Sequence, residues 1–115
     1  MPHLVNLNED PLMSECLIYQ IKKGRTVVGN SSCDKPCDIR LSGASILSEH
    51  CHFENSDDGV VTIHSRPNST TIVNGLRISA SQPKELRSGF RIILGDFHVF
   101  RFKSVVRPSF RSCHG

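Results

Sequence analysis

The chain has 115 residues, enough for one domain with a hydrophobic core but too few for two. Its formal net charge of +3 comes entirely from Lys103, Arg107 and Arg111, because residues 1–102 hold 11 basic and 11 acidic side chains. This balance argues against nucleic-acid binding, which usually places a basic stripe on the folded part. No run approaches the roughly 18 apolar residues of a membrane span, and no signal-peptide pattern opens the chain, so neither insertion nor secretion is expected.

Turn-forming residues recur along the chain, and the runs between them are β-branched or aromatic. The run Val60–His64 is β-branched and too short for a stable helix. Asn74-Gly75 predicts a tight type I′ hairpin, and Gly95-Asp96 a second tight reversal. Many short strands with turns about every eight to twelve residues predict an all-β sandwich or barrel. We expect strands near 3–8, 15–22, 25–29, 39–41, 50–54, 60–65, 71–73, 76–78, 90–94 and 97–102.

Two segments do not fit the strand pattern. Residues 11–15 could be a short helical turn or an irregular connection, since Pro11 suits a first helical position. Residues 103–115 are polar and interrupted by Pro108, which predicts a disordered tail or linker. We therefore expect one domain over residues 1–102, followed by that tail.

The cysteine pattern indicates free thiols. An odd number without a signal peptide is typical of reduced cytosolic cysteines. Cys16 and Cys51 lie in apolar runs and are expected to pack as small hydrophobic side chains. Zinc held by Cys33 and Cys37 with a histidine is an alternative, but their spacing is loose and no second cysteine pair supports it. The five cysteines are Cys16, Cys33, Cys37, Cys51 and Cys113.

No catalytic constellation is recognisable. His50 and His52 could share one strand face as metal ligands, but the pair lacks further ligands, so hydrogen-bonded structural histidines are the preferred interpretation. Cys51 points away from both, because neighbours on a strand face opposite sides. A nucleophile elbow and a phosphate-binding glycine loop are both absent from the sequence. We expect no enzymatic activity, no cofactor and no metal.

The order of several short motifs resembles the forkhead-associated (FHA) domain over about residues 15–102. The lead-in at residues 2–15 and the ending His98–Phe102 narrow the resemblance to the FHA domain of kinesin-3 family motors. The motifs are Asp38-Ile39-x-Leu41, Leu47-Ser48-Glu49-His50-Cys51-x-Phe53, Thr71-x-Val73-Asn74-Gly75 and Leu86-x-Ser88-Gly89-x-x-Ile92-x-Leu94-Gly95.

This resemblance implies a two-sheet β-sandwich of about eleven short strands, with a binding surface on the loops at one end. It also implies a piece of a larger cytoplasmic, microtubule-associated motor whose ATPase domain lies outside this chain. In the family the motif histidine, here His50, braces loops and does not hold phosphate. We expect His50 to be buried or half-buried and bonded to the loop at residues 29–34.

Typical FHA domains bind phosphothreonine, and here the residues that do so are mostly replaced. The strand-end Gly29 is followed by Asn30 where the family has arginine. Leu47 occupies the place of the phosphate-binding serine, and Ser48 that of a basic residue. Losing one charged donor and one hydroxyl should remove a few kcal/mol, at ~1.5–3 for a charged hydrogen bond. Lys35 and Arg40 could substitute, but the sequence does not place them.

The segment matching the family's peptide-clamping asparagine reads Ser69-Thr70-Thr71, with Asn68 one place too early. The expected function is therefore a non-catalytic protein-interaction module, largely independent of phosphothreonine. Its partners would be a flanking coiled coil, adaptors or cargo, and its role would be to regulate motor assembly or cargo binding. Two alternatives are a phosphothreonine reader with relocated contacts and a structural spacer beside coiled coils.

Overall fold

The computed structural model describes residues 1–8, 16–34 and 36–105, and within them eleven strands and no helix are present. The predicted helical turn at 11–15 and most of the predicted tail lie outside the described residues. Within those ranges no helix is long and apolar enough to cross a membrane. The strands are β1 (His3–Asn6), β2 (Ile18–Gln20), β3 (Gly24–Gly29), β4 (Ile39–Arg40), β5 (Cys51–Asn55), β6 (Val61–Ser65), β7 (Thr71–Val73), β8 (Leu76–Arg77), β9 (Lys84–Leu86), β10 (Arg91–Leu94) and β11 (His98–Lys103).

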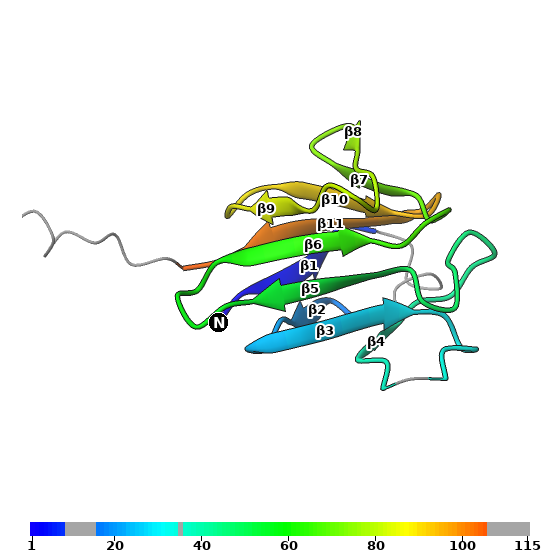
Figure 1. The fold of residues 1–115 in the computed structure, drawn as a ribbon, viewed down its shortest axis with the longest axis horizontal. Coiled ribbons are helices and arrows are strands. Elements are labelled where there is room, and N and C mark those ends of the chain that lie inside the picture. The colour runs from blue at the N-terminus through cyan, green and yellow to red at the C-terminus, as the bar shows by residue number, and fades with distance from the viewer. Residues whose placement is uncertain (9–15, 35, 106–115) are drawn as a thin grey trace, which may run out of the picture.

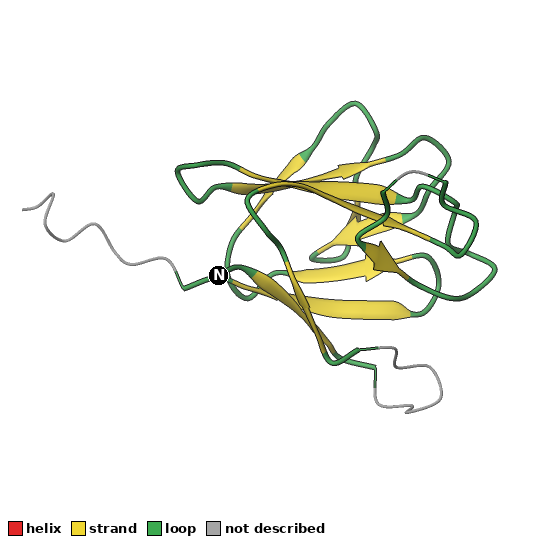
Figure 2. Cartoon of the chain, turned by 90° about the horizontal axis from the view of Figure 1, so that it is seen from below, coloured by secondary structure: helices red, strands yellow, loops and turns green. Residues whose placement is uncertain are grey.

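The strands form two sheets that lie as separate layers (Figure 2). The six-stranded sheet has the order β2-β1-β11-β10-β7-β8, and the five-stranded sheet has the order β4-β3-β5-β6-β9. Pairing is antiparallel except between β3 and β4. The predicted all-β, two-sheet sandwich is confirmed.

The ten predicted strands all occur, and one strand was missed. Strand β9 pairs with β6 although its sequence, Lys84-Glu85-Leu86, lacks β-branched residues. Lys103, predicted to begin the tail, is the last residue of β11 and lies opposite His3. The observed strands are mostly one to three residues shorter at their ends than predicted, as is usual for boundaries.

The core lies between the sheets and is built by alternation along the strands. On β5 the side chains of Cys51 and Phe53 point inward, and on β11 those of Phe100 and Phe102 do the same; all four are fully buried or nearly so. Fully burying each phenylalanine contributes about 1.5–3 kcal/mol. Tyr19 packs edge-on against Phe100 at a ring distance of 5.9 Å.

The tight turns follow their sequence signals. Asn74 and Gly75 both have positive φ, at 50° and 84°, and they join β7 to β8, so the predicted hairpin is confirmed. Gly95 also has positive φ, and only three residues separate β10 from β11.

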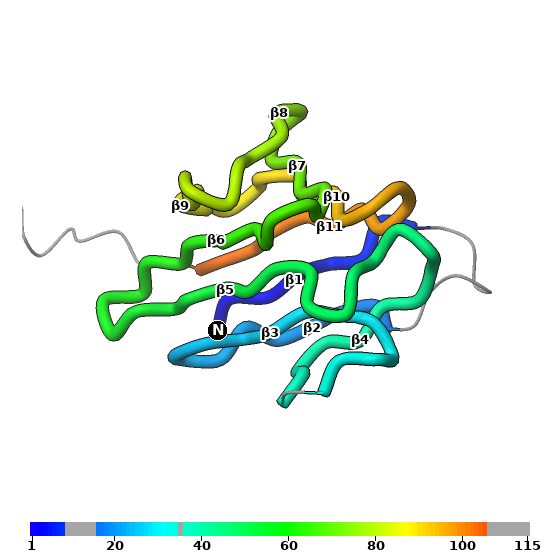
Figure 3. The backbone as a smooth tube through the Cα atoms, turned by 45° about the vertical axis from the view of Figure 1, so that its right-hand side comes forward, coloured from blue at the N-terminus to red at the C-terminus, as the bar shows by residue number. Residues whose placement is uncertain are grey.

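The loops β3–β4, β4–β5 and β6–β7 gather at one end of the sandwich, to the right in Figure 1, whereas the first residue lies towards the other end. The tube in Figure 3 shows the β4–β5 connection curving back beside the β3–β4 loop. All the residues predicted to form a peptide-binding site belong to these three loops or to the strand ends beside them.

Candidate functional site

His50 joins two of the loops at this end. Its ring is fully buried just before β5. The Leu47 N–H donates to Nδ1 at 3.2 Å, and Nε2 lies 2.8 Å from the Thr70 carbonyl oxygen. Because a carbonyl only accepts, Nε2 carries the proton and the ring is neutral.

Burial lowers the pKa of His50, and nearby His98 lowers it further, against the opposing effect of the bond to Thr70. The predicted burial is confirmed, but the predicted partner is wrong. The ring bonds to Leu47 in the β4–β5 loop and to Thr70 in the β6–β7 loop. Its place just before β5 directs the side chain between these two loops and not towards residues 29–34.

Gly29 is required by a close approach of backbones. A Cβ on Gly29 would lie 2.0 Å from the carbonyl oxygen of Ser48, closer than atoms can approach. The Asn30 N–H donates to the Leu47 carbonyl at 3.1 Å just beside this contact. The glycine therefore lets the β3–β4 and β4–β5 loops touch.

Asn30 stabilises these same loops through its side chain. Its Nδ2 donates to the Ile46 carbonyl at 2.8 Å, and its Oδ1 accepts from the Ser32 N–H at 2.7 Å. One amide hydrogen and the amide oxygen are thus committed within the protein. Asn30 therefore braces the β3–β4 loop against the β4–β5 loop.

Leu47, Ser48 and Arg40 surround this brace. Leu47 is half-buried and Ser48 is exposed. Arg40 is exposed, and its guanidinium donates to the carbonyls of Asn30 and Cys33 at 3.1 and 3.2 Å. It lines an open pocket of about 410 Å³ with Asn30 and Ser42. Arg40 therefore brings positive charge to this end, but with donors partly used by carbonyls; Lys35 lies outside the described residues.

The hydroxyl of Ser69 is bonded within the protein. This residue is buried, and its Oγ donates to the Arg66 carbonyl at 2.8 Å and bonds with the Ser65 hydroxyl at 2.8 Å. Thr70 contributes its backbone carbonyl, which accepts from the Gly95 N–H at 2.9 Å as well as from His50. The structure thus gives both residues internal partners.

Two arginines that sequence reasoning did not select lie beside this loop. Arg66 and Arg77 line an open pocket of about 350 Å³ together with Asn68 and Ser69. Arg77 Nη2 is 3.5 Å from the Ser69 carbonyl, at the limit of a hydrogen bond, and Arg66 is 3.8 Å from Glu49. Their proximity depends on the β6–β7 and β8–β9 connections, which the sequence does not position.

A second buried histidine, His98, bonds to the β4–β5 loop. Its Nε2 lies 2.6 Å from the Ser42 carbonyl. The Asp96 N–H donates to the Ser45 hydroxyl at 2.9 Å. The sequence signal was that His98 alternates with Phe100 and Phe102 and therefore shares their inward face. A buried histidine needs a hydrogen-bond partner, so such a bond could have been expected.

The cysteine predictions are partly correct. Among the described residues the four cysteines are thiols outside any disulfide, and Cys51 is fully buried as expected. Cys16 is exposed, so the prediction that it packs as a hydrophobic side chain is wrong. It lies before β2 and contributes nothing to the core. Burial raises the pKa of Cys37 to about 11. Cys113 lies outside the described residues.

His50 and His52, which the sequence offered as a disfavoured metal-ligand pair, have different partners in the structure. His50 lies between the loops, whereas His52 contacts Glu54 and His64 on β5 and β6. Within residues 1–8, 16–34 and 36–105, these last three are the only group of at least three side chains placed to share a metal ion.

The β-sandwich agrees with comparisons to known proteins. The FHA domain family model matches residues 24–95, and a kinesin-associated family model matches residues 1–25. The chain belongs to the FHA domain family. The FHA domain is a non-catalytic fold that mediates protein interactions.

The expected likeness to kinesin-3 motors is confirmed. The chain is 57% identical to Kinesin-like protein KIF1B of Homo sapiens over 105 residues and 52% identical to Kinesin-like protein unc-104 of Caenorhabditis elegans over 102 residues. These matches cover 88% and 89% of this chain but only 6% of each relative.

Solved structures share the fold. The FHA domain of an Arabidopsis thaliana hypothetical protein matches with a TM-score of 0.74 and 20% identity, over 93% of this chain and 87% of that one. The MEK1 FHA domain in complex with a HOP1 phosphothreonine peptide matches with a TM-score of 0.68 and 25% identity, over 91% of this chain and 97% of that one.

Proposed function

We propose that this chain is the interaction module of a kinesin-3-like motor and that its loop end binds protein partners largely without phosphothreonine. Its partners would be a flanking coiled coil, an adaptor or a cargo protein, and its role would be regulation of motor assembly or cargo binding. This places it in the cytoplasm, on microtubules through the parent motor. The domain would span residues 1–103, because Lys103 ends β11, with the following residues serving as a linker.

The observation that carries this proposal is the state of Asn30. A phosphate bears nearly two negative charges and is held best by charged donors. Asn30 supplies no charge, and its amide is bonded to Ile46 and Ser32. Leu47 adds an apolar side chain where a hydroxyl would bond phosphate. The loop end is therefore well braced but poor in phosphate ligands.

Binding of a coiled coil is tested with the 115-residue chain as bait and the flanking coiled-coil segment of the parent motor as prey. Saturable capture that Ser48→Glu weakens supports the proposal, because Ser48 is exposed between the braced loops. Ser81→Glu, on an exposed turn in the β8–β9 connection, is the matched control. If neither the coiled coil nor any adaptor binds, the chain is a structural spacer.

A second candidate is a phosphopeptide reader with relocated contacts, favoured by Arg66 and Arg77 in one pocket. Two guanidinium groups can hold a phosphate in bidentate fashion. A phosphothreonine peptide titration of the Arg77→Gln variant distinguishes this reader from the phosphate-independent module. Phosphate-dependent binding that disappears in this variant would favour the reader over the phosphate-independent module.

A further inference from the structure

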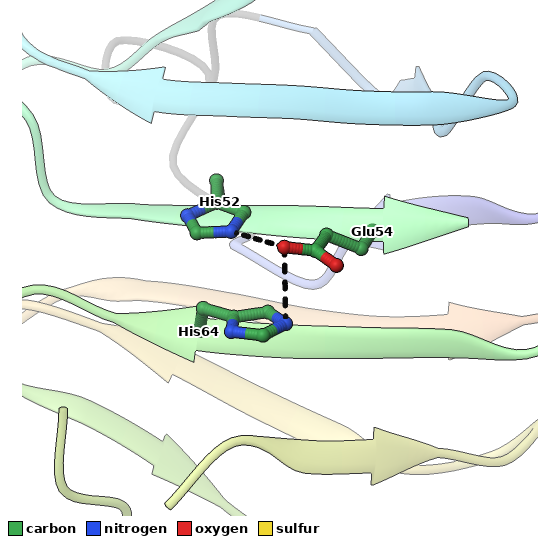
Figure 4. A group of neighbouring side chains, drawn as sticks. All are labelled: His52, Glu54 and His64. Atoms are coloured by element: carbon green, nitrogen blue, oxygen red, sulfur yellow. Dashed lines mark hydrogen bonds and ion pairs between the residues drawn. The ribbon is translucent and has the colours of Figure 1, made fainter. Parts of the chain in front are cut away.

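Three side chains with metal-ligating groups meet on adjacent strands of the five-stranded sheet. His52 and Glu54 are two residues apart on β5, and His64 lies directly opposite His52 on β6. Residues two apart on a strand face the same side, so the pairing places all three on one face. Figure 4 shows the carboxylate of Glu54 lying against both imidazoles.

The ligand atoms are close enough to share one ion. One atom from each residue lies within 4.8 Å of the others. His52 Nε2 is 2.9 Å and His64 Nε2 is 3.5 Å from Glu54 Oε2. Ligands at about 2.0–2.2 Å from a tetrahedral zinc ion are separated by roughly 3.3 Å, which is near these values.

One rearrangement is needed. The two rings stack at 4.5 Å with planes 9° apart, so their nitrogen lone pairs run side by side. The rings must turn for both lone pairs to converge on one ion. Glu54 is 54% exposed at its side chain and His64 24%, which leaves room for this movement and for a water ligand.

We propose that His52, Glu54 and His64 form a binding site for zinc, with a fourth position open to water. Two imidazoles and one carboxylate are a donor set that zinc accepts with three protein ligands. This proposal differs from the expectation, drawn from the sequence, that the chain holds no metal.

The surrounding groups regulate the affinity of this site. Arg25 on β3 lies opposite Glu54, and its Nη2 is 3.3 Å from His52 Nδ1. If His52 binds the ion through Nε2, its proton must lie on Nδ1, and the contact of Nδ1 with the Arg25 guanidinium opposes this. The positive charge of the guanidinium also repels the ion. On β6 the Thr62 hydroxyl is 3.1 Å from His64 Nε2 and must release it. Glu85 on β9 lies opposite Thr62 and adds favourable negative charge.

The test is calorimetry of ZnCl₂ binding to the metal-free, reduced 115-residue chain, with NMR of the histidine rings. We expect one zinc ion per chain and shifts at His52 and His64. His64→Asn should weaken binding about tenfold or more, since even outer partners of ligands contribute about 10–100-fold. The matched control is His3→Asn, because His3 lies on β1, in the other sheet. This change should leave zinc binding unchanged.

Two further variants keep the test decisive. Arg25→Gln removes the charge and offers an oxygen to Nδ1–H, so zinc should bind roughly threefold to tenfold more tightly. The double variant Cys33→Ser plus Cys37→Ser should retain the site. Binding that is lost in this cysteine variant but kept in His64→Asn would assign the zinc to thiols and overturn the proposal. So would absence of binding by the wild type and by Arg25→Gln.

Discussion

The Nε2 of His50 donates to the carbonyl oxygen of Thr70 at 2.8 Å, across two loops that are distant in sequence. The same ring accepts from Leu47 on its other nitrogen, so a neutral imidazole links the β4–β5 loop to the β6–β7 loop. This link lies beneath the surface that we propose for partner binding.

Replacing His50 with Ala should therefore destabilise the domain strongly. The change leaves the part-buried Thr70 carbonyl with fewer partners and the part-buried Leu47 N–H without its acceptor, at up to about 1–3 kcal/mol each, besides a cavity. Urea unfolding measures this loss. His3→Ala, on β1 near the start of the chain, is the control and should change stability far less. Equal effects of the two changes would contradict the bracing role.

Stability should also depend on pH through His50. Its folded-state pKa lies below the ordinary 6.5, so between these values the unfolded chain binds a proton that the folded chain excludes. Stability is then fully present above pH 6.5 and decreases as the pH falls below it. Melting temperatures from pH 7.5 to 5 check this, and His50→Gln should flatten the slope. Part of the slope should remain, because burial also lowers the pKa of His52. Melting temperatures that rise on acidification would contradict the assignment.

Gly29→Ala should separate the β3–β4 and β4–β5 loops. Its Cβ would lie 2.0 Å from the carbonyl oxygen and 2.9 Å from the carbonyl carbon of Ser48, which are both backbone atoms, so the loops must move. We expect a loss of about 1–3 kcal/mol in stability, the range for overpacking. Thermal unfolding measures it, with Ser31→Ala in the exposed part of the same loop as control. A neutral Gly29→Ala would show that the close approach is absent.

Gly75→Val should weaken the β7–β8 hairpin. Gly75 has φ of 84°, where a β-branched residue is strained, and the expected loss is at least ~1 kcal/mol. Gly75→Asn, which tolerates positive φ better, should lose less. An unchanged melting midpoint for the valine variant would mean that the turn conformation is wrong.

Local sequence signals predicted much of the fold. The Asn74-Gly75 turn and strand β7 are specified by neighbouring residues, so they could be read directly. Strand β9 was missed because its pairing with β6, and not its own composition, makes it a strand.

The site was harder to predict, because it depends on which loops and strands become neighbours. The partner of His50 is 20 residues away, and the bonds of Asn30 run to Ile46. His64 joins His52 only through the register of β5 and β6. The sequence indicated that Asn30 is uncharged but not that its side chain bonds to Ile46 and braces two loops.

We propose that the loop end lacks a functional phosphate site. Restoring ligands with Asn30→Arg plus Leu47→Ser should create phosphate-dependent binding, which should weaken as salt rises. The gain is expected to be smaller than about 1.5–3 kcal/mol, the range for one charged hydrogen bond, because Asn30→Arg also removes the bonds to Ile46 and Ser32. Asn30→Ala plus Leu47→Ser is the control, since it removes the same bonds without adding charge.

The most direct measurement is calorimetry of the unchanged chain with a panel of phosphothreonine peptides, each paired with its unphosphorylated form. We predict weak binding with little difference within each pair. Submicromolar binding that requires the phosphate would contradict this and establish a phosphothreonine reader with relocated contacts.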